Sequence, residues 1–200
     1  MLIATYLLSA FTDALWVNVV QLLAFVATLL LALRNALISQ RIARAALVVI
    51  LAGTAVAAAL VQTHPSPSVL GAAQLWTALI LLITVIVIVR RILADPAVTL
   101  QSIYAALAAY MIIGLMFAAC YAAMNRLGSG PFFANGSPGN TRTFQYFSFT
   151  TLTTLGYGDF TAASNAGRAV AVMEAMAGQI FLATLVARLV SAFRLSPPRE

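Results

Sequence analysis

The sequence predicts an all-α integral membrane protein with five transmembrane helices. Hydrophobic residues make up 62% of the 200 residues, charged residues make up only 8%, and the mean hydropathy is +0.99. About a quarter of the residues in a typical soluble domain are charged. Four apolar stretches contain no charged residue: 14–33, 45–61, 69–89 and 103–124. A fifth, residues 169–193, contains Glu174 and Arg188.

Each stretch is long enough to cross a hydrocarbon core of about 30 Å at about 1.5 Å per residue. Residues 45–61 reach this length only if their flanks add a turn. Residues 14–33 have no basic segment before them and are too long for the core of a signal peptide, so we expect a retained helix. Residues 1–11 are also apolar and either extend this helix or lie at the interface. The first three helices form an N-terminal transmembrane region, residues 1–95.

The connections separate this region from a second module. Residues 64–68 are a short Pro- and Ser-rich link, and Asp95-Pro96 marks the boundary. We expect Asp95 to cap the next helix, with Pro96 in its first turn. Residues 96–194 then form the second module and residues 195–200 a short tail. Within the module, residues 127–143 are rich in Gly, Asn, Ser and Pro, which predicts an irregular loop.

The segment between the last two apolar stretches holds the most informative motif. Residues 150–159 read Thr-Thr-Leu-Thr-Thr-Leu-Gly-Tyr-Gly-Asp. Glycines that alternate with larger residues allow the backbone to turn successive carbonyl groups to one side. Repeated around an axis, such segments would form a cage of neutral oxygens that replaces the water of a monovalent cation. A Gly-Tyr-Gly in a soluble protein is more often a tight turn, but the Thr-rich approach and the two flanking spans favour a pore.

This motif resembles the signature of the potassium channel family, and the resemblance covers residues 103–194. It implies a bacterial-type small channel: an outer helix, a turret, a re-entrant pore helix at 143–153, a filter and an inner helix. One chain supplies one loop and a closed filter needs four, so we expect a homotetramer. The implied function is potassium-selective permeation, with K⁺ as the permeant ion, membrane lipid around the protein, and no cofactor.

The resemblance also implies roles for single residues. Asp159 adds negative charge at the pore mouth. Tyr146, Phe147 and Thr150 lie where the family supports its filter. For the two aromatic residues, support of the filter and ordinary apolar packing are physically almost the same interpretation. The ion-binding filter residues are Thr154, Leu155, Gly156, Tyr157 and Gly158.

Two residues depart from the family pattern. Leu155 replaces the usual Val or Ile, so the segment loses β-branching there. Thr150 stands where some relatives have a carboxylic acid that pairs with the residue matching Asp159. The stability of the filter is therefore open, whereas the ring of carbonyls is unaffected.

The last helix carries three further candidates. Gly178 matches a position where many relatives bend this helix, but a glycine in a membrane helix is equally a packing surface. Gln179, Leu182 and Val186 share one face and by resemblance line the cavity. Glu174 lies about 10 Å inside the helix, a depth at which a carboxylate suggests function. We expect it to hydrogen-bond a hydroxyl such as that of Thr150, Thr151 or Thr153 and to affect gating, or simply to be a protonated side chain between helices.

The orientation follows from two arguments. A potassium-type loop enters from outside, which places the C-terminus in the cytoplasm and the N-terminus outside the cell membrane. Cytoplasmic segments generally carry more Arg and Lys, and the resulting eight-to-three division agrees with this rule. The outer arginines are Arg126, Arg142 and Arg168; the inner ones are Arg34, Arg41, Arg44, Arg90, Arg91, Arg188, Arg194 and Arg199.

Several other functions are disfavoured. The arginines are dispersed at helix ends rather than clustered, which argues against nucleic acid. No cluster of metal-ligating or catalytic residues supports an enzyme or a resident metal other than permeant K⁺. No span has Arg at every third position, so strong voltage dependence is not expected. A potassium transporter subunit, or a non-conducting sensor or partner subunit that retains the loop, remains an alternative.

Overall fold

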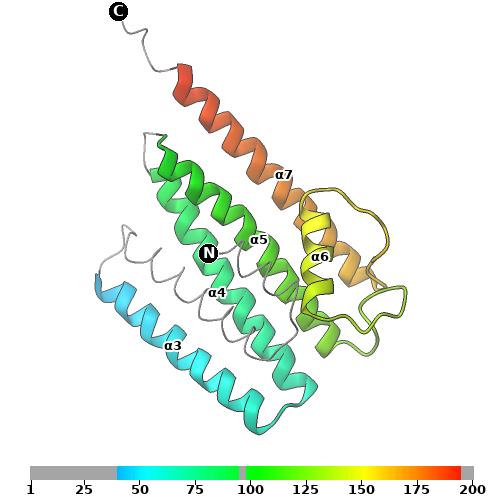
Figure 1. The fold of residues 1–200 in the computed structure, drawn as a ribbon. Coiled ribbons are helices and arrows are strands. Elements are labelled where there is room, and N and C mark those ends of the chain that lie inside the picture. Colours follow the sequence, from blue (N-terminus) through cyan, green and yellow to red (C-terminus); the bar gives the residue numbers. More distant parts are fainter. Residues whose placement is uncertain (1–39, 95–97, 195–200) are drawn as a thin grey trace, which may run out of the picture.

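The computed structural model describes residues 40–94 and 98–194, and within them the structured elements are five helices and irregular loops (Figure 1). The predicted span 14–33 and the interfacial segment 1–11 lie outside the described residues. The helices are α3 (Gln40–Thr63), α4 (Pro67–Ala94), α5 (Leu100–Leu127), α6 (Thr141–Leu152) and α7 (Asn165–Arg194).

Helices α3, α4 and α5 lie side by side (Figure 1). Pro67 opens α4, because a proline fits the first helical position, where no N–H bond is needed. Gly71 near the start of α4 lies against Leu127 at the end of α5, so the two helices are antiparallel. Leu81 of α4 packs with Ile112 and Leu115 of α5 in a buried cluster.

Three helices have the length and composition to cross a membrane: Pro67–Ala94, Leu100–Leu127 and Asn165–Arg188. These contain or overlap the predicted spans 69–89, 103–124 and 169–193. The predicted span 45–61 lies inside α3, but its apolar part, Leu47–Thr63, is shorter than the other three. The structure is therefore that of an all-helical protein with three long apolar helices among the described residues.

The start of α5 differs from the expectation. Its N-cap is Thr99, whose hydroxyl accepts a hydrogen bond from the Ser102 N–H in a capping box. The prediction that Asp95 caps this helix is wrong, because the helix begins at Leu100, too far along the chain for that side chain to cap it. Asp95 and Pro96 themselves lie outside the described residues.

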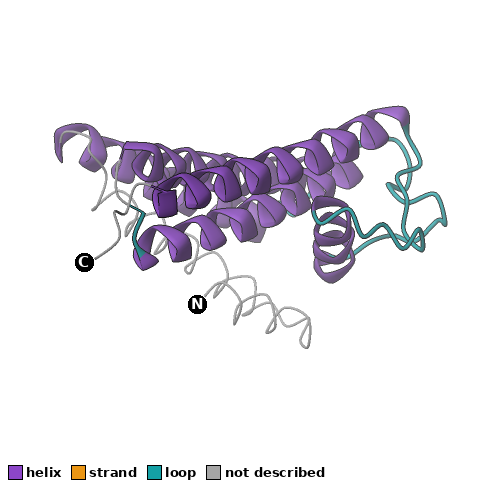
Figure 2. Ribbon diagram, turned by 90° about the horizontal axis from the view of Figure 1, so that it is seen from above, coloured by secondary structure: helices purple, strands orange, loops and turns teal. Residues whose placement is uncertain are grey.

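Helix α6 is short and packs between α5 and α7 near one end of the bundle (Figure 1, Figure 2). It runs from Thr141 to Leu152, two residues earlier at its start and one earlier at its end than the predicted 143–153. The shift has a local cause: the Asn140 side chain accepts from the Thr143 N–H and caps the helix.

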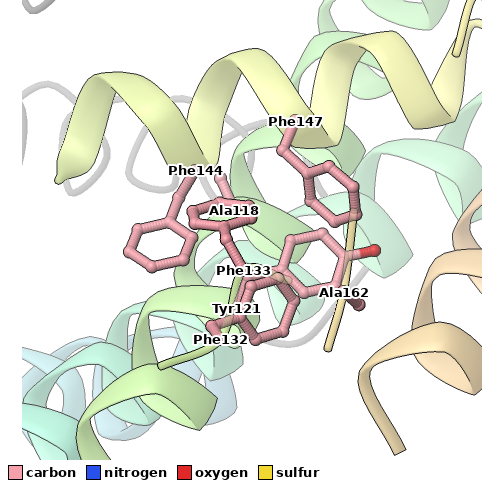
Figure 3. Packing of buried hydrophobic residues seen from close by; sticks show 7 residues of the cluster. All are labelled: Ala118, Tyr121, Phe132, Phe133, Phe144, Phe147 and Ala162. Carbon is pink, nitrogen blue, oxygen red and sulfur yellow. The ribbon is translucent and has the colours of Figure 1, made fainter. Parts of the chain in front are cut away.

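An aromatic cluster anchors α6 and the loops around it (Figure 3). Phe144 and Phe147 point from α6 toward Tyr121 of α5 and toward Phe132 and Phe133 of the loop 128–140. The ring centroids of Tyr121 and Phe147 lie 5.0 Å apart at a steep angle. Aromatic rings prefer such edge-to-face contacts, which add stability beyond the burial of apolar area.

The two irregular loops are joined to each other. Phe133 and Ala162 form an antiparallel bridge, with hydrogen bonds from the Ala134 N–H to the Thr161 carbonyl and from the Ala163 N–H to the Phe132 carbonyl, both 2.8 Å. The loop after α6 is therefore fixed at both of its ends: by α6 itself and by the loop 128–140.

Candidate ion-binding site

The backbone after α6 alternates in handedness. Thr154, Gly156 and Gly158 have positive φ angles of 58°, 52° and 82°, and Leu155 and Tyr157 do not have positive values. Glycine adopts positive φ without steric cost, but a β-branched residue such as Thr154 rarely does. Such outliers concentrate at functional sites, where the surrounding structure holds them in place.

The hydrogen bonds of this segment show which way its carbonyls point. The N–H groups of Leu155 and Gly156 both donate to the Thr150 carbonyl, at 2.8 and 3.1 Å, and the Thr154 N–H donates to the Thr151 carbonyl at 2.9 Å. The described residues contain no cis peptide bond. In a trans peptide unit the C=O points opposite to the N–H.

It follows that the carbonyls preceding these three N–H groups, those of Thr153, Thr154 and Leu155, all point away from α6. In a regular strand they would alternate between two sides. Three successive oxygens on one side are suited to a cation, and the N–H groups, which would repel it, are turned into the protein.

The end of α6 adds to this arrangement. The helix ends at Leu152, directly before residues 153–158, which we call the carbonyl segment, and the C-terminus of a helix carries a partial negative charge. The hydroxyl of Tyr110 on α5 donates to the Leu152 carbonyl at 3.3 Å. This bond ties the last turn of α6 to α5.

Tyr146 supports the far end of the segment. Its ring stacks on Tyr157, with centroids 6.4 Å apart and planes 5° from parallel, and it meets Phe160 edge-on. Asp159 interacts electrostatically with Tyr146, and its backbone carbonyl accepts a hydrogen bond from the Asn135 side chain at 3.1 Å. Because position 150 is a threonine, the sequence suggested no partner for Asp159. In the structure its partners come from other positions.

The other two residues predicted to support the filter have different surroundings. Phe147 points into the aromatic cluster (Figure 3). Thr150 contributes its backbone carbonyl, which accepts the two N–H bonds described above, while its hydroxyl donates to the Phe147 carbonyl at 3.0 Å. No sequence pattern indicates which carbonyl of α6 accepts the hydrogen bonds from the N–H groups of Leu155 and Gly156.

Helix α7 packs against the end of α6 at Gly178. A Cβ added at Gly178 would lie 2.5 Å from the Leu152 carbonyl oxygen and 2.9 Å from its Cδ1 atom. The helix is continuous from Asn165 to Arg194. Of the two readings of Gly178, the geometry therefore favours close packing over a bend.

The predicted cavity residues lie further along α7. The Gln179 side chain donates to the Thr154 hydroxyl at 3.4 Å, which places it at the end of the carbonyl segment that is nearer to α6 in the chain. Leu182 and Val186 follow on the same face and are 37% and 56% exposed in the single chain. The carbonyl segment is open as well, with Leu155 55% and Tyr157 68% exposed.

Glu174 is buried and bonded to two other helices. The Tyr121 hydroxyl of α5 donates to its Oε2 atom at 2.5 Å, and its Oε1 atom forms a hydrogen bond with the Ser148 hydroxyl of α6. We expected a hydroxyl near the filter end of this helix, and the partner is a hydroxyl of α6, but not one of the suggested threonines: Thr150, Thr151 and Thr153 lie two, three and five residues after Ser148.

The residues missed from sequence, Tyr110, Gly114 and Tyr121, recur at spacings of four and seven on one face of α5. Gly114 lets α6 approach: a Cβ there would lie 2.7 Å from Phe149. A polar and small-residue stripe on an apolar helix is a signal that could have identified this face. Ser148 gives no comparable signal in a helix rich in hydroxyls.

No group of three or more His, Cys, Asp or Glu that could hold a metal ion occurs in residues 40–94 and 98–194. The candidate ligands for a cation are the backbone carbonyls of residues 153–155, and the Thr154 hydroxyl beside them donates to the Thr153 carbonyl at 2.7 Å.

Comparison with known families gives a match in the second half of the chain. Residues 105–194 match the family model Ion_trans_2, described as an ion channel. No curated protein and no solved structure matches the chain. The matched segment runs from α5 through α6 and the carbonyl segment to the end of α7. The match covers 90 of the 200 residues, and together with the apolar helices it suggests a membrane protein with an ion channel function.

Proposed function

We propose that the protein is a potassium-selective channel, in which four copies of the chain surround a central pore. The observation that carries this proposal is the run of carbonyls of Thr153, Thr154 and Leu155, turned to one side by N–H bonds to α6. Neutral carbonyl dipoles replace the hydration shell of K⁺ without binding it too tightly to leave. The matched domain also occurs in potassium channels.

One copy covers only one side of an ion. The carbonyl segment and the face of α7 that carries Gln179, Leu182 and Val186 are exposed in the single chain. Four copies around a fourfold axis would turn these faces toward one another and close the ring of oxygens. The pore would then pass the filter residues 154–158, with Asp159 at its mouth and the α7 face along its cavity.

We place the channel in the cell membrane with the N-terminus outside and the C-terminus in the cytoplasm. Arg126, Arg142 and Arg168 lie at the end of the bundle where the loops gather, and Arg90 and Arg91 end α4 at the opposite side. The described helices α3 and α4 carry no row of arginines through their apolar length. Gating by voltage would therefore be weak.

A flux assay on purified protein in liposomes tests the proposal. Vesicles loaded with KCl should take up tracer Rb⁺ through the protein, and external Na⁺ should be far less effective than K⁺ in competing for entry. Flux that saturates and that depends strictly on a second, co-transported ion would instead indicate a transporter subunit. Intact tetramers that pass neither ion would indicate a sensor or partner subunit.

A further inference from the structure

Glu174 connects three helices at one buried point. Glu174, Ser148 and Tyr121 are each 0% exposed, and they belong to α7, α6 and α5. The Ser148 oxygen lies within hydrogen-bonding distance of two acceptors, Oε1 of Glu174 and the Gly114 carbonyl, the latter at 2.6 Å. The Tyr121 hydroxyl occupies the other carboxyl oxygen.

Counting protons decides how these bonds are arranged. A serine hydroxyl has one proton and can donate only one hydrogen bond. The Gly114 carbonyl can only accept, so its bond uses the Ser148 proton. The bond between Ser148 and Glu174 then needs a second proton, and only the carboxyl group can supply it.

We propose that Glu174 is a neutral carboxylic acid that joins the three helices in a directed chain of hydrogen bonds. Tyr121 donates to Oε2 of Glu174, the protonated Oε1 donates to Ser148, and Ser148 donates to the Gly114 carbonyl. Every donor and acceptor in this chain is used once. Glu174 is then a positioning residue: it fixes α6, and with it the carbonyl segment, relative to α7.

The surroundings agree with a neutral acid. The titratable groups that interact electrostatically with Glu174 are Tyr110, Cys120 and Tyr121 of α5. All three are uncharged near neutral pH, and α6 presents the neutral Ser148, so none of these groups offers a positive charge to a carboxylate. Loss of the Glu174 proton would leave Ser148 with two acceptors and one proton, and one link of the chain would break.

Infrared spectroscopy of the protein in lipid bilayers tests the protonation directly. The difference spectrum between the wild type and Glu174→Gln at neutral pH should contain the C=O stretch of a protonated carboxyl group, shifted downward in D₂O. The difference removes the other four carboxyl side chains of the sequence, at positions 13, 95, 159 and 200. A carboxylate band at Glu174, with no acid band, would overturn the proposal.

The positioning role rests on the proposed function and is tested by K⁺ flux measured across the same pH range. The amide oxygen of glutamine can accept from Tyr121 and its NH2 group can donate to Ser148, as the neutral acid does, so Glu174→Gln should keep the flux and make it independent of pH. Wild-type flux should follow the intensity of the acid band. Flux that changes while the band is constant, or stays constant while the band disappears, would contradict this role.

The two arms separate the two claims. An acid band in a protein that conducts no ion would leave the neutral acid in place and remove the channel. Selective flux without the acid band would do the reverse. Ser148→Ala provides a check on the chain: it removes the acceptor of the Glu174 proton, and the acid band should shift to higher frequency as that hydrogen bond is lost.

Discussion

Single backbone angles carry much of the proposed selectivity. Gly156 has a φ of 52°, and no atom lies within 4 Å of the position that a Cβ would take. The need for glycine here is therefore conformational and not a matter of space. The sequence predicted this need at Gly156 and Gly158, but not the positive φ of Thr154, because threonine gives no local sign of it.

Replacing Gly156 by alanine should abolish selective K⁺ flux while the helices remain folded. An L-residue at this φ costs about 1–2 kcal/mol, so the peptide units would rotate and move their carbonyls. Flux and circular dichroism are measured on the same reconstituted protein. Gly130→Ala is the control, because Gly130 is also uncrowded but lies outside the positive φ region. Wild-type selectivity in Gly156→Ala would show that this segment is not the filter.

Tyr121 places a ring in the aromatic cluster and a hydroxyl on Glu174. Tyr121→Phe keeps the ring and leaves a buried acceptor without its donor, which costs about 1–3 kcal/mol. The midpoint of thermal unfolding in detergent should fall. Tyr104→Phe is the control, because Tyr104 lies on the same helix and is 68% exposed. Equal midpoints for both variants would show that the Tyr121 hydroxyl does not stabilise the protein.

At the scale of elements, local sequence signals predicted existence better than boundaries. Length and apolarity identified α4, α5 and α7, since these properties are visible in any window of the chain. The start of α5 was misassigned because Thr99 and Asp95 are both good capping residues and only the fold selects one. The partner of Glu174 was misassigned for a related reason: Ser148 lies within one helical turn of Thr150 and Thr151.

The sign of the stability change in Gly178→Ala distinguishes a packing role of this glycine from a bending role. Alanine is favoured over glycine in a helix by about 1 kcal/mol, so at a bend or a free surface Gly178→Ala should stabilise the protein. The 2.5 Å approach to the Leu152 backbone predicts the opposite, because α7 would have to move away from α6. Thermal unfolding of the reconstituted protein measures the sign. An increase in stability would assign Gly178 to bending.

At the scale of the whole molecule, one chain leaves a channel incomplete. Only 11% of the apolar window of α7 is buried, compared with 44% for α5. Such a face needs lipid or another protein to cover it. Motif and composition predicted this requirement, because a single loop cannot surround an ion. The geometry of the contact between copies has no local signal in the sequence.

The protein extracted in mild detergent should therefore contain four copies. Native mass spectrometry would give the mass of the protein without its detergent, and four times 21.1 kDa is expected. The same preparation is tested for Rb⁺ flux, so that mass and activity refer to one species. Conducting protein that is monomeric or dimeric would contradict the fourfold pore.

The central claim is that the carbonyls of residues 153–155 select K⁺ over Na⁺. The most direct measurement is the reversal potential of currents through the purified protein in a planar bilayer with K⁺ on one side and an equal concentration of Na⁺ on the other. The account predicts a reversal potential displaced strongly toward the K⁺ equilibrium potential in the wild type. A reversal potential near zero, in a preparation whose currents are lost when Gly156 is replaced by alanine, would show a cation pore without potassium selectivity and contradict it.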